Sequence, residues 1–148
     1  MSVDLYFLRS SEQKIVADMV KYARVDTHEK YTEFYGLTKK DLGLYALKDS
    51  RVVGAIWSRE INTTPLLNIA VLPEYRKSGI ASSMMVQFLL EAGELYEEIQ
   101  AELNDATLGF YEKFGFQKLE DSNVLVKKLE KKVIIRPSDG YDPKRWMD

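Results

Sequence analysis

The sequence predicts an α/β fold built on a mixed sheet, and two observations carry that prediction. Short runs rich in β-branched and aromatic residues recur along the 148 residues, and the segments between them place apolar residues at the helical period. The order is strand, helix, antiparallel strands, then β-α-β-α-β-β. This order excludes a helical bundle and a β-sandwich.

A strand and an amphipathic helix are expected first. Residues 3–8 are β-rich, and apolar residues between positions 15 and 23 recur at helical spacing, which predicts a helix over about 11–25. The segment 26–42 combines charged and aromatic residues around a glycine. It predicts a second short helix followed by a loop.

An antiparallel hairpin and a further strand are expected next. Two β-rich runs, 44–48 and 52–61, flank the turn-forming sequence Asp49-Ser50-Arg51, and this arrangement is typical of a hairpin. Residues 65–72 predict the strand that follows.

The clearest helix is expected from about residue 80 to residue 95. An apolar stripe recurs at the helical period, and polar residues lie on the opposite side. The apolar residues are Ile80, Met84, Met85, Phe88, Leu89, Ala92 and Leu95, and the polar residues are Ser83, Gln87, Glu91 and Glu94. A strand over 99–103 and a helix from Asp105 to about Phe114 follow, with Gly115 as its C-cap glycine. Strands at 116–119 and 124–129 complete the sheet.

Size and composition predict one domain over residues 1–130 with a C-terminal extension over 131–148. The chain is long enough to bury a core without disulfides, and the absence of cysteine excludes a thiol nucleophile and a thiolate metal site. One histidine, His28, and no ligand spacing argue against a metal.

Charge and hydropathy restrict the partners. A net charge of -2 gives no overall attraction to nucleic acid, and no run approaches the ~20 apolar residues that a membrane span requires. An early acid and only a short apolar run precede Arg9, unlike a signal peptide. We therefore expect a soluble cytoplasmic protein with neither a nucleic-acid nor a membrane partner.

A strand-to-helix turn supplies the candidate anion site. It reads Pro73-Glu74-Tyr75-Arg76-Lys77-Ser78-Gly79-Ile80-Ala81-Ser82. Unpaired N–H groups and the positive end of the helix dipole attract phosphate at such a turn, and small residues let the backbone approach it. The alternative is an ordinary turn with solvated charges. Neither a dinucleotide fingerprint nor a Walker loop is present.

Two blocks in the second half of the chain resemble a known family. The stretch 67–81, Leu-Asn-Ile-Ala-Val-Leu-Pro-Glu-Tyr-Arg-Lys-Ser-Gly-Ile-Ala, is similar to the acetyl-CoA motif of the GNAT superfamily of N-acetyltransferases. The stretch 104–116, Asn-Asp-Ala-Thr-Leu-Gly-Phe-Tyr-Glu-Lys-Phe-Gly-Phe, resembles a second family segment. The resemblance covers roughly 66–119.

The resemblance implies a mostly antiparallel sheet of six to seven strands with a splayed strand pair, flanked by about four helices. It implies acetyl-CoA as cosubstrate, with the pantetheine arm pairing with the backbone near Val71 and meeting Asn104, and with Tyr111 donating a proton to the departing sulfur. The alternatives are a packing role for Tyr111 and a helix N-cap for Asn104. The residues expected to hold the pyrophosphate are Arg76, Lys77, Ser78, Gly79, Ile80, Ala81 and Ser82.

The general base has no match in the family pattern, since Thr64-Pro65-Leu66 stands where some members carry a glutamate. Glu60 is the substitute, acting directly or through water, and its alternative is a solvated strand-end charge. Tyr31, Phe34 and Tyr35 either line an acceptor pocket or pack the second helix.

These expectations point to an acyltransferase that passes an acetyl group from acetyl-CoA directly to a primary amine of a small molecule or protein. The alternative is a non-catalytic acyl-CoA sensor or partner-binding module on the same fold, which the missing carboxylate favours. A homodimer is possible through the C-terminal extension.

Overall fold

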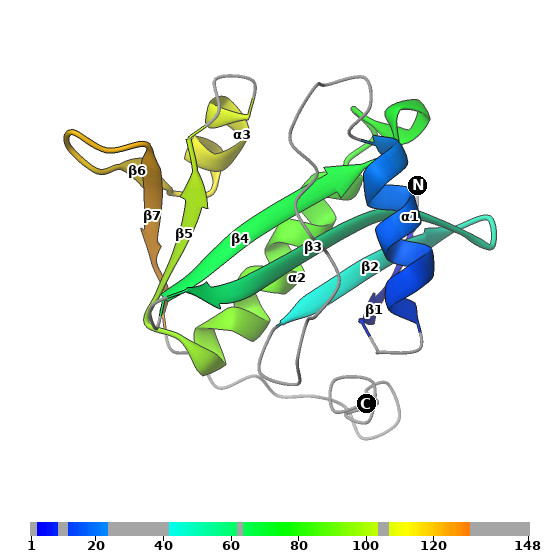
Figure 1. Ribbon diagram of the computed structural model, residues 1–148, viewed down its shortest axis with the longest axis horizontal. Coiled ribbons are helices and arrows are strands. Elements are labelled where there is room, and N and C mark those ends of the chain that lie inside the picture. The colour runs from blue at the N-terminus through cyan, green and yellow to red at the C-terminus, as the bar shows by residue number, and fades with distance from the viewer. Residues whose placement is uncertain (1–2, 9–11, 24–41, 62–63, 104–106, 131–148) are drawn as a thin grey trace.

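The computed structural model describes residues 3–8, 12–23, 42–61, 64–103 and 107–130. Within this part, seven strands form one sheet in the order β1-β2-β3-β4-β5-β7-β6 (Figure 1). All neighbours are antiparallel except β4 and β5, which run parallel. The strands are β1 Asp4–Phe7, β2 Gly43–Lys48, β3 Arg51–Ile61, β4 Thr64–Val71, β5 Glu98–Glu102, β6 Gln117–Lys118 and β7 Val124–Lys128. The predicted α/β class and the mostly antiparallel sheet are confirmed.

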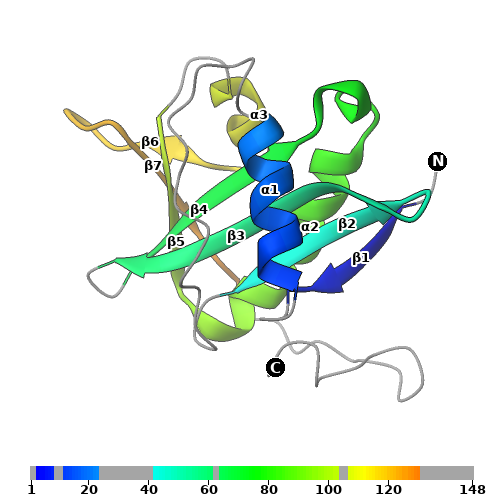
Figure 2. The same ribbon diagram turned by 45° about the vertical axis from the view of Figure 1, so that its right-hand side comes forward.

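Three α-helices are described around this sheet. Helix α1 (Gln13–Ala23) covers one face and α2 (Ile80–Leu95) covers the other, while α3 (Leu108–Lys113) lies between β5 and β6 in the chain (Figures 1 and 2). The short second helix expected in 26–42 falls almost wholly on residues 24–41, which lie outside the described part of the chain. None of the described helices is long and apolar enough to cross a membrane.

The core extends over both faces of β3. Successive strand residues point to opposite faces, and Ile56 and Trp57 both have 0% of their surface exposed. Met84 of α2 lies against Gly54, so Gly54 and Ile56 face α2. Trp57 therefore faces α1. Burial on both sides explains why β3 reads as an almost continuous apolar run.

The polar side of α2 differs from the prediction at Glu91. This carboxylate was expected to face solvent, but only 6% of Glu91 is exposed, and Gln87 Nε2 donates a hydrogen bond to its Oε1 at 3.2 Å. Leu95 was expected in the core but is 48% exposed at the end of the helix. The helical period alone therefore predicted neither the burial of Glu91 nor the exposure of Leu95.

The ends of the last elements also differ in detail. Helix α3 begins at Leu108, and residues 105 and 106 of the helix predicted from Asp105 lie outside the described residues. Gly115 has a φ of 90°, which confirms its role in ending the helix. Strand β6 is two residues long, shorter than expected. Residues 131–148, the expected extension, are also outside the described part.

Candidate functional site

Strands β4 and β5 pair only at one end. Their register joins Leu66 to Gln100 and Leu67 to Ala101, and it goes no further toward Val71. Figure 1 shows the two strands diverging from this shared end, with β4 leading to the turn before α2 and β5 leading toward α3. The second half of β4 is therefore without a β5 neighbour, which is the splayed pair that the sequence resemblance implied.

The main chain of Val71 points toward this divergence. Leu72 donates its N–H to Val53 at 2.9 Å, which makes Val53 and Leu72 a hydrogen-bonded pair of the antiparallel β3–β4 ladder. Such pairs alternate along a ladder, so the neighbouring pair, Gly54 and Val71, is not hydrogen-bonded. The N–H and C=O of Val71 consequently face away from β3, on the β5 side.

The turn after β4 is open around Gly79. This residue is the N-cap of α2 with φ 88° and ψ 0°, a left-handed conformation that glycine adopts without strain. A Cβ built on Gly79 would meet no atom of the described residues within 4 Å. Lys77 also has a positive φ, 62°, and the Ser78 hydroxyl donates to the Tyr75 carbonyl, so the turn is tightly wound. No described side chain fills the space above Gly79.

The helix that follows begins beside that space with amides that have no acceptor inside the helix. The first α2 hydrogen bond runs from Ser83 N–H to the Gly79 carbonyl at 3.0 Å, so the N–H groups of Ile80, Ala81 and Ser82 precede it. Among the described residues no side chain caps this end, and no acidic residue stands in the first turn of α2. Aligned peptide dipoles add partial positive charge, so the turn can accept a diphosphate.

Arg76 and Lys77 differ in what their side chains do. The Arg76 guanidinium donates from Nε to the Val71 carbonyl at 3.0 Å and from Nη2 to the Ala23 carbonyl at 2.6 Å. These bonds tie the turn to the end of β4 and to the last residue of α1. The side chain of Lys77 is exposed beside Gly79. Phosphate binding by both cations stays a prediction.

The turn is also held by contacts between Tyr75, Glu74 and the β2–β3 hairpin, which the sequence did not suggest. Lys48 and Arg51, which flank the turn of the β2–β3 hairpin, place their charged groups 5.7 and 5.9 Å from the centre of the Tyr75 ring. Arg51 also lies 3.5 Å from the Glu74 carboxylate. The face of an aromatic ring attracts a cation at this distance. The only sequence signal was a pair of cations flanking a hairpin turn.

Tyr111 lies on α3 and is 5% exposed. Its ring packs edge-on against Phe116 with centroids 5.1 Å apart, and against Phe110 at 5.7 Å. The N–H groups of Phe114 and Phe116 both donate to the Tyr111 carbonyl, which fixes the tyrosine at the end of the short helix. The packing expected as its alternative role is present, and its role as proton donor stays a prediction.

The remaining predicted site residues are placed only in part. The backbone of Glu60 pairs with Pro65 across β3 and β4, near the end where β4 and β5 meet. Asn104, His28 and the aromatic residues at 31, 34 and 35 lie outside the described residues. Glu60 and Asn104 therefore remain sequence predictions.

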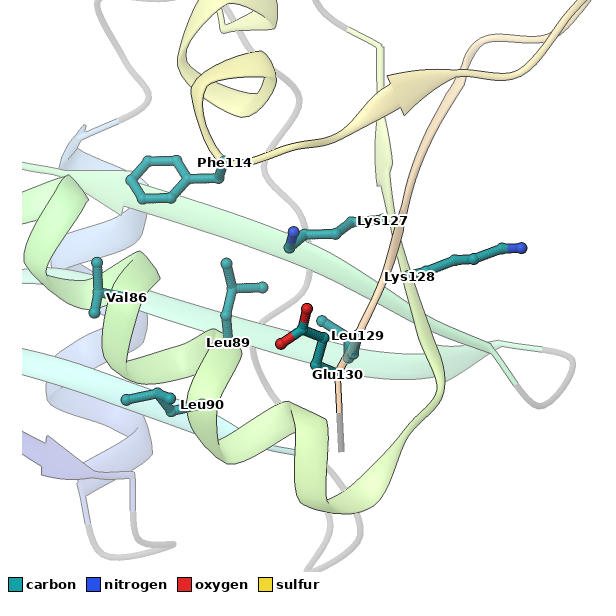
Figure 3. A pocket seen from close by; sticks show the side chains of 8 residues that line it. All are labelled: Val86, Leu89, Leu90, Phe114, Lys127, Lys128, Leu129 and Glu130. Carbon is teal, nitrogen blue, oxygen red and sulfur yellow. The ribbon is translucent and has the colours of Figure 1, made fainter. Parts of the chain in front are cut away.

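A pocket lies along α2, away from the turn at Gly79. It has a volume of about 320 Å³ and lies between α2 and the end of β7. Figure 3 shows the Lys127 side chain reaching toward Leu89 and Phe114, while Lys128 points away. Val86 is 53% exposed at its edge. None of the residues predicted for the site lines this pocket.

Comparisons with known proteins agree with this geometry. An N-alpha-acetyltransferase from Saccharolobus solfataricus is 28% identical, over 78% of this chain and 82% of that protein. The crystal structure of the ribosomal-protein-S18-alanine N-acetyltransferase from Escherichia coli has a TM-score of 0.70 at 13% identity, covering 95% of this chain and 100% of that chain. A GNAT family acetyltransferase from Brucella melitensis, in complex with acetyl-CoA, has a TM-score of 0.69 at 20% identity, covering 86% of this chain and 88% of that chain.

The two structural likenesses show the fold, and the family follows from the sequence itself. The family model for the acetyltransferase (GNAT) domain matches residues 40–118. The match spans more than half of the chain and includes both the turn at Gly79 and Tyr111. The chain therefore belongs to the GNAT family of acetyltransferases.

Proposed function

We propose that this acetyltransferase transfers the acetyl group of acetyl-CoA directly to a primary amine, with the α-amino group of a protein as the acceptor to test first. The observation that carries the proposal is the open, uncapped turn at Gly79, next to the point where β4 and β5 have parted. A diphosphate at the turn would leave an extended arm beside Val71.

The main chain would do most of the binding. The N–H groups of Ile80, Ala81 and Ser82 would donate to phosphate oxygens, and Gly79 has no side chain to keep them away. Lys77 would add a charge-assisted bond from the exposed side of the turn. Since Arg76 already donates to the Val71 carbonyl, the Val71 N–H is the group at this residue that would pair with an amide carbonyl of the arm.

For this reaction the protein has to position the amine beside the thioester and to transfer protons. Acetyl-CoA supplies an acetyl group already activated as a thioester. Glu60 would take one proton from the neutral amine, directly or through water, as the nitrogen lone pair forms its bond to the acetyl carbon. Tyr111 would give its phenolic proton to the sulfur as the carbon–sulfur bond breaks. Fixing amine and thioester side by side supplies the rest of the acceleration.

The acceptor is proposed from the relatives. The Saccharolobus relative is named an N-alpha-acetyltransferase, and the Escherichia coli structure is an acetyltransferase of a protein alanine. A polypeptide α-amine is therefore the first candidate for this chain. A small-molecule amine would be an alternative outcome of the same assay.

The location and assembly of the enzyme belong to the same proposal. We propose a cytoplasmic enzyme in which residues 1–130 form the acetyltransferase domain and residues 131–148 form an extension. Sedimentation at several protein concentrations would show whether the chain forms a homodimer.

The test is an acetyl-transfer assay on paired peptides. The wild-type protein should consume acetyl-CoA and add one acetyl group to a peptide with a free N-terminus and no lysine, but not to the same peptide with a formylated N-terminus. Polyamines and free amino acids form the small-molecule arm. Absence of transfer to every amine would contradict the proposed activity.

A matched pair of variants tests whether CoA binds at the turn around Gly79. Gly79→Glu places a carboxylate where the diphosphate is proposed to bind and should lower CoA affinity by tenfold or more, which corresponds to about 1.4 kcal/mol. Asn123→Glu adds the same charge at an exposed residue before β7 and should leave the affinity unchanged. Equal affinity in both variants, measured by calorimetric titration with CoA, would exclude the turn as the site.

A further inference from the structure

Arg76 joins three elements that are far apart in the sequence. It stands in the turn between β4 and α2, it reaches the Val71 carbonyl at the end of β4, and it reaches the Ala23 carbonyl 53 positions earlier. Ala23 is the last residue of α1 and has 0% of its surface exposed. A single side chain thus connects the helix on one face of the sheet to the turn that starts the helix on the other face.

The chemistry of this contact favours a fixed geometry. The last carbonyls of a helix have no intrahelical donor and carry the negative end of the helix dipole, so a guanidinium is a favourable partner for Ala23. The planar guanidinium can donate in two fixed directions at once. Lysine carries the same charge but cannot reproduce both directions.

We propose that Arg76 is a positioning residue that couples the C-terminal turn of α1 to the phosphate turn, instead of a ligand of the phosphate. Because Arg76 lies only three residues before Gly79, holding its side chain on Val71 and Ala23 restricts the backbone that leads into the turn at Gly79. This inference rests on the proposed binding of CoA at that turn. Coupling between two sites is reciprocal, so CoA bound at the turn must also order the end of α1.

The test is hydrogen exchange of the α1 amides, followed by mass spectrometry with and without CoA. In the wild-type protein, saturating CoA should slow exchange in the last turn of α1 by about fivefold or more, the lower range of allosteric coupling. Arg76→Met and Arg76→Lys should abolish this protection while still binding CoA. Unchanged α1 exchange in the wild type, or full protection in both variants, would overturn the proposal.

Lys77→Met is the matched control, because Lys77 is the adjacent cation and its side chain is exposed. It should weaken CoA binding and flatten its dependence on salt, as loss of a phosphate contact does. At saturating CoA it should keep the protection of α1. Arg76→Met should keep the wild-type salt dependence. A flattened salt dependence in Arg76→Met would identify Arg76 as a phosphate ligand instead.

Failure of CoA binding is distinguishable from failure of the coupling. If the wild-type protein does not bind CoA, the proposed function fails, and the ligand-free proteins still test the contact. Faster α1 exchange in free Arg76→Met than in the free wild type would support the connection between Arg76 and Ala23. Equal exchange in the two free proteins would overturn it.

Discussion

Gly93 of α2 and Glu130, just beyond β7, touch so closely that no side chain fits between them. A Cβ at Gly93 would lie 2.7 Å from the main-chain oxygen of Glu130. The neighbouring Leu129 donates its N–H to the Glu97 carbonyl at 2.8 Å, which holds this stretch in place. The approach fixes the end of β7 against α2, beside the pocket of Figure 3.

Gly93→Ala should therefore destabilise the fold. The new methyl group would press on a backbone atom, and overpacking of this kind typically costs about 1–3 kcal/mol. Gly109→Ala is the control, because Gly109 lies in α3 and no atom in the part of the chain that the structure describes comes within 4 Å of its Cβ position. It should be neutral or stabilising by up to about 1 kcal/mol. Urea unfolding of both variants provides the measurement, and equal midpoints would contradict the close contact.

Tyr111→Phe should separate catalysis from packing. The phenyl ring keeps the edge contacts with Phe110 and Phe116, so the melting temperature and the CoA affinity should change little. Loss of the proposed proton donor should lower kcat by about 10²-fold or more. Tyr22→Phe, at a side of α1 where the tyrosine is 57% exposed, should leave all three quantities unchanged. Parallel losses of stability, affinity and kcat in Tyr111→Phe would assign the residue to the core alone.

Local pattern predicted most of the fold because it reflects local physics. The alternating or continuous apolar runs gave β2, β3 and β4, and the turn glycines at 79 and 115 both adopt the positive φ that their positions require. The splayed strands came from family resemblance, and the ending of the β4–β5 ladder at Leu67 bears that out.

What sequence reasoning missed depends on contacts between distant segments. Glu91 reads as a solvent-facing residue of α2, yet packing of the helix buries it. The bond from Arg76 to the Ala23 carbonyl was not predicted either, because no local pattern links two residues that lie 53 positions apart. The contacts of Lys48 and Arg51 with the Tyr75 ring likewise join a hairpin to a turn more than 20 positions later.

Glu60→Gln should test the substitute base. A glutamine of the same size cannot accept the proton of the amine, so kcat should fall by about 10²-fold or more while CoA affinity stays constant. The rate should also lose the rise with pH that titration of a base produces. Glu102→Gln, an exposed acid at the end of β5, serves as the control. If Glu60→Gln kept the wild-type kcat, Glu60 would be a solvated charge at the end of its strand, and another residue would be the general base.

Proline substitution in β4 should show which main-chain groups serve the ligand. Ala70 belongs to a hydrogen-bonded pair with Ala55, so Ala70→Pro removes a ladder bond and should strongly destabilise the sheet. Val71→Pro removes an N–H that faces away from β3, and the sheet should survive with a smaller loss of stability.

CoA affinity in Val71→Pro should nevertheless fall by roughly 2- to 10-fold, the value of one hydrogen bond of about 0.5–1.5 kcal/mol. Val71→Ala keeps the N–H and should bind CoA almost as the wild type does. Thermal unfolding and calorimetric titration of the three variants would contradict the pairing if Val71→Pro and Val71→Ala bound CoA equally well.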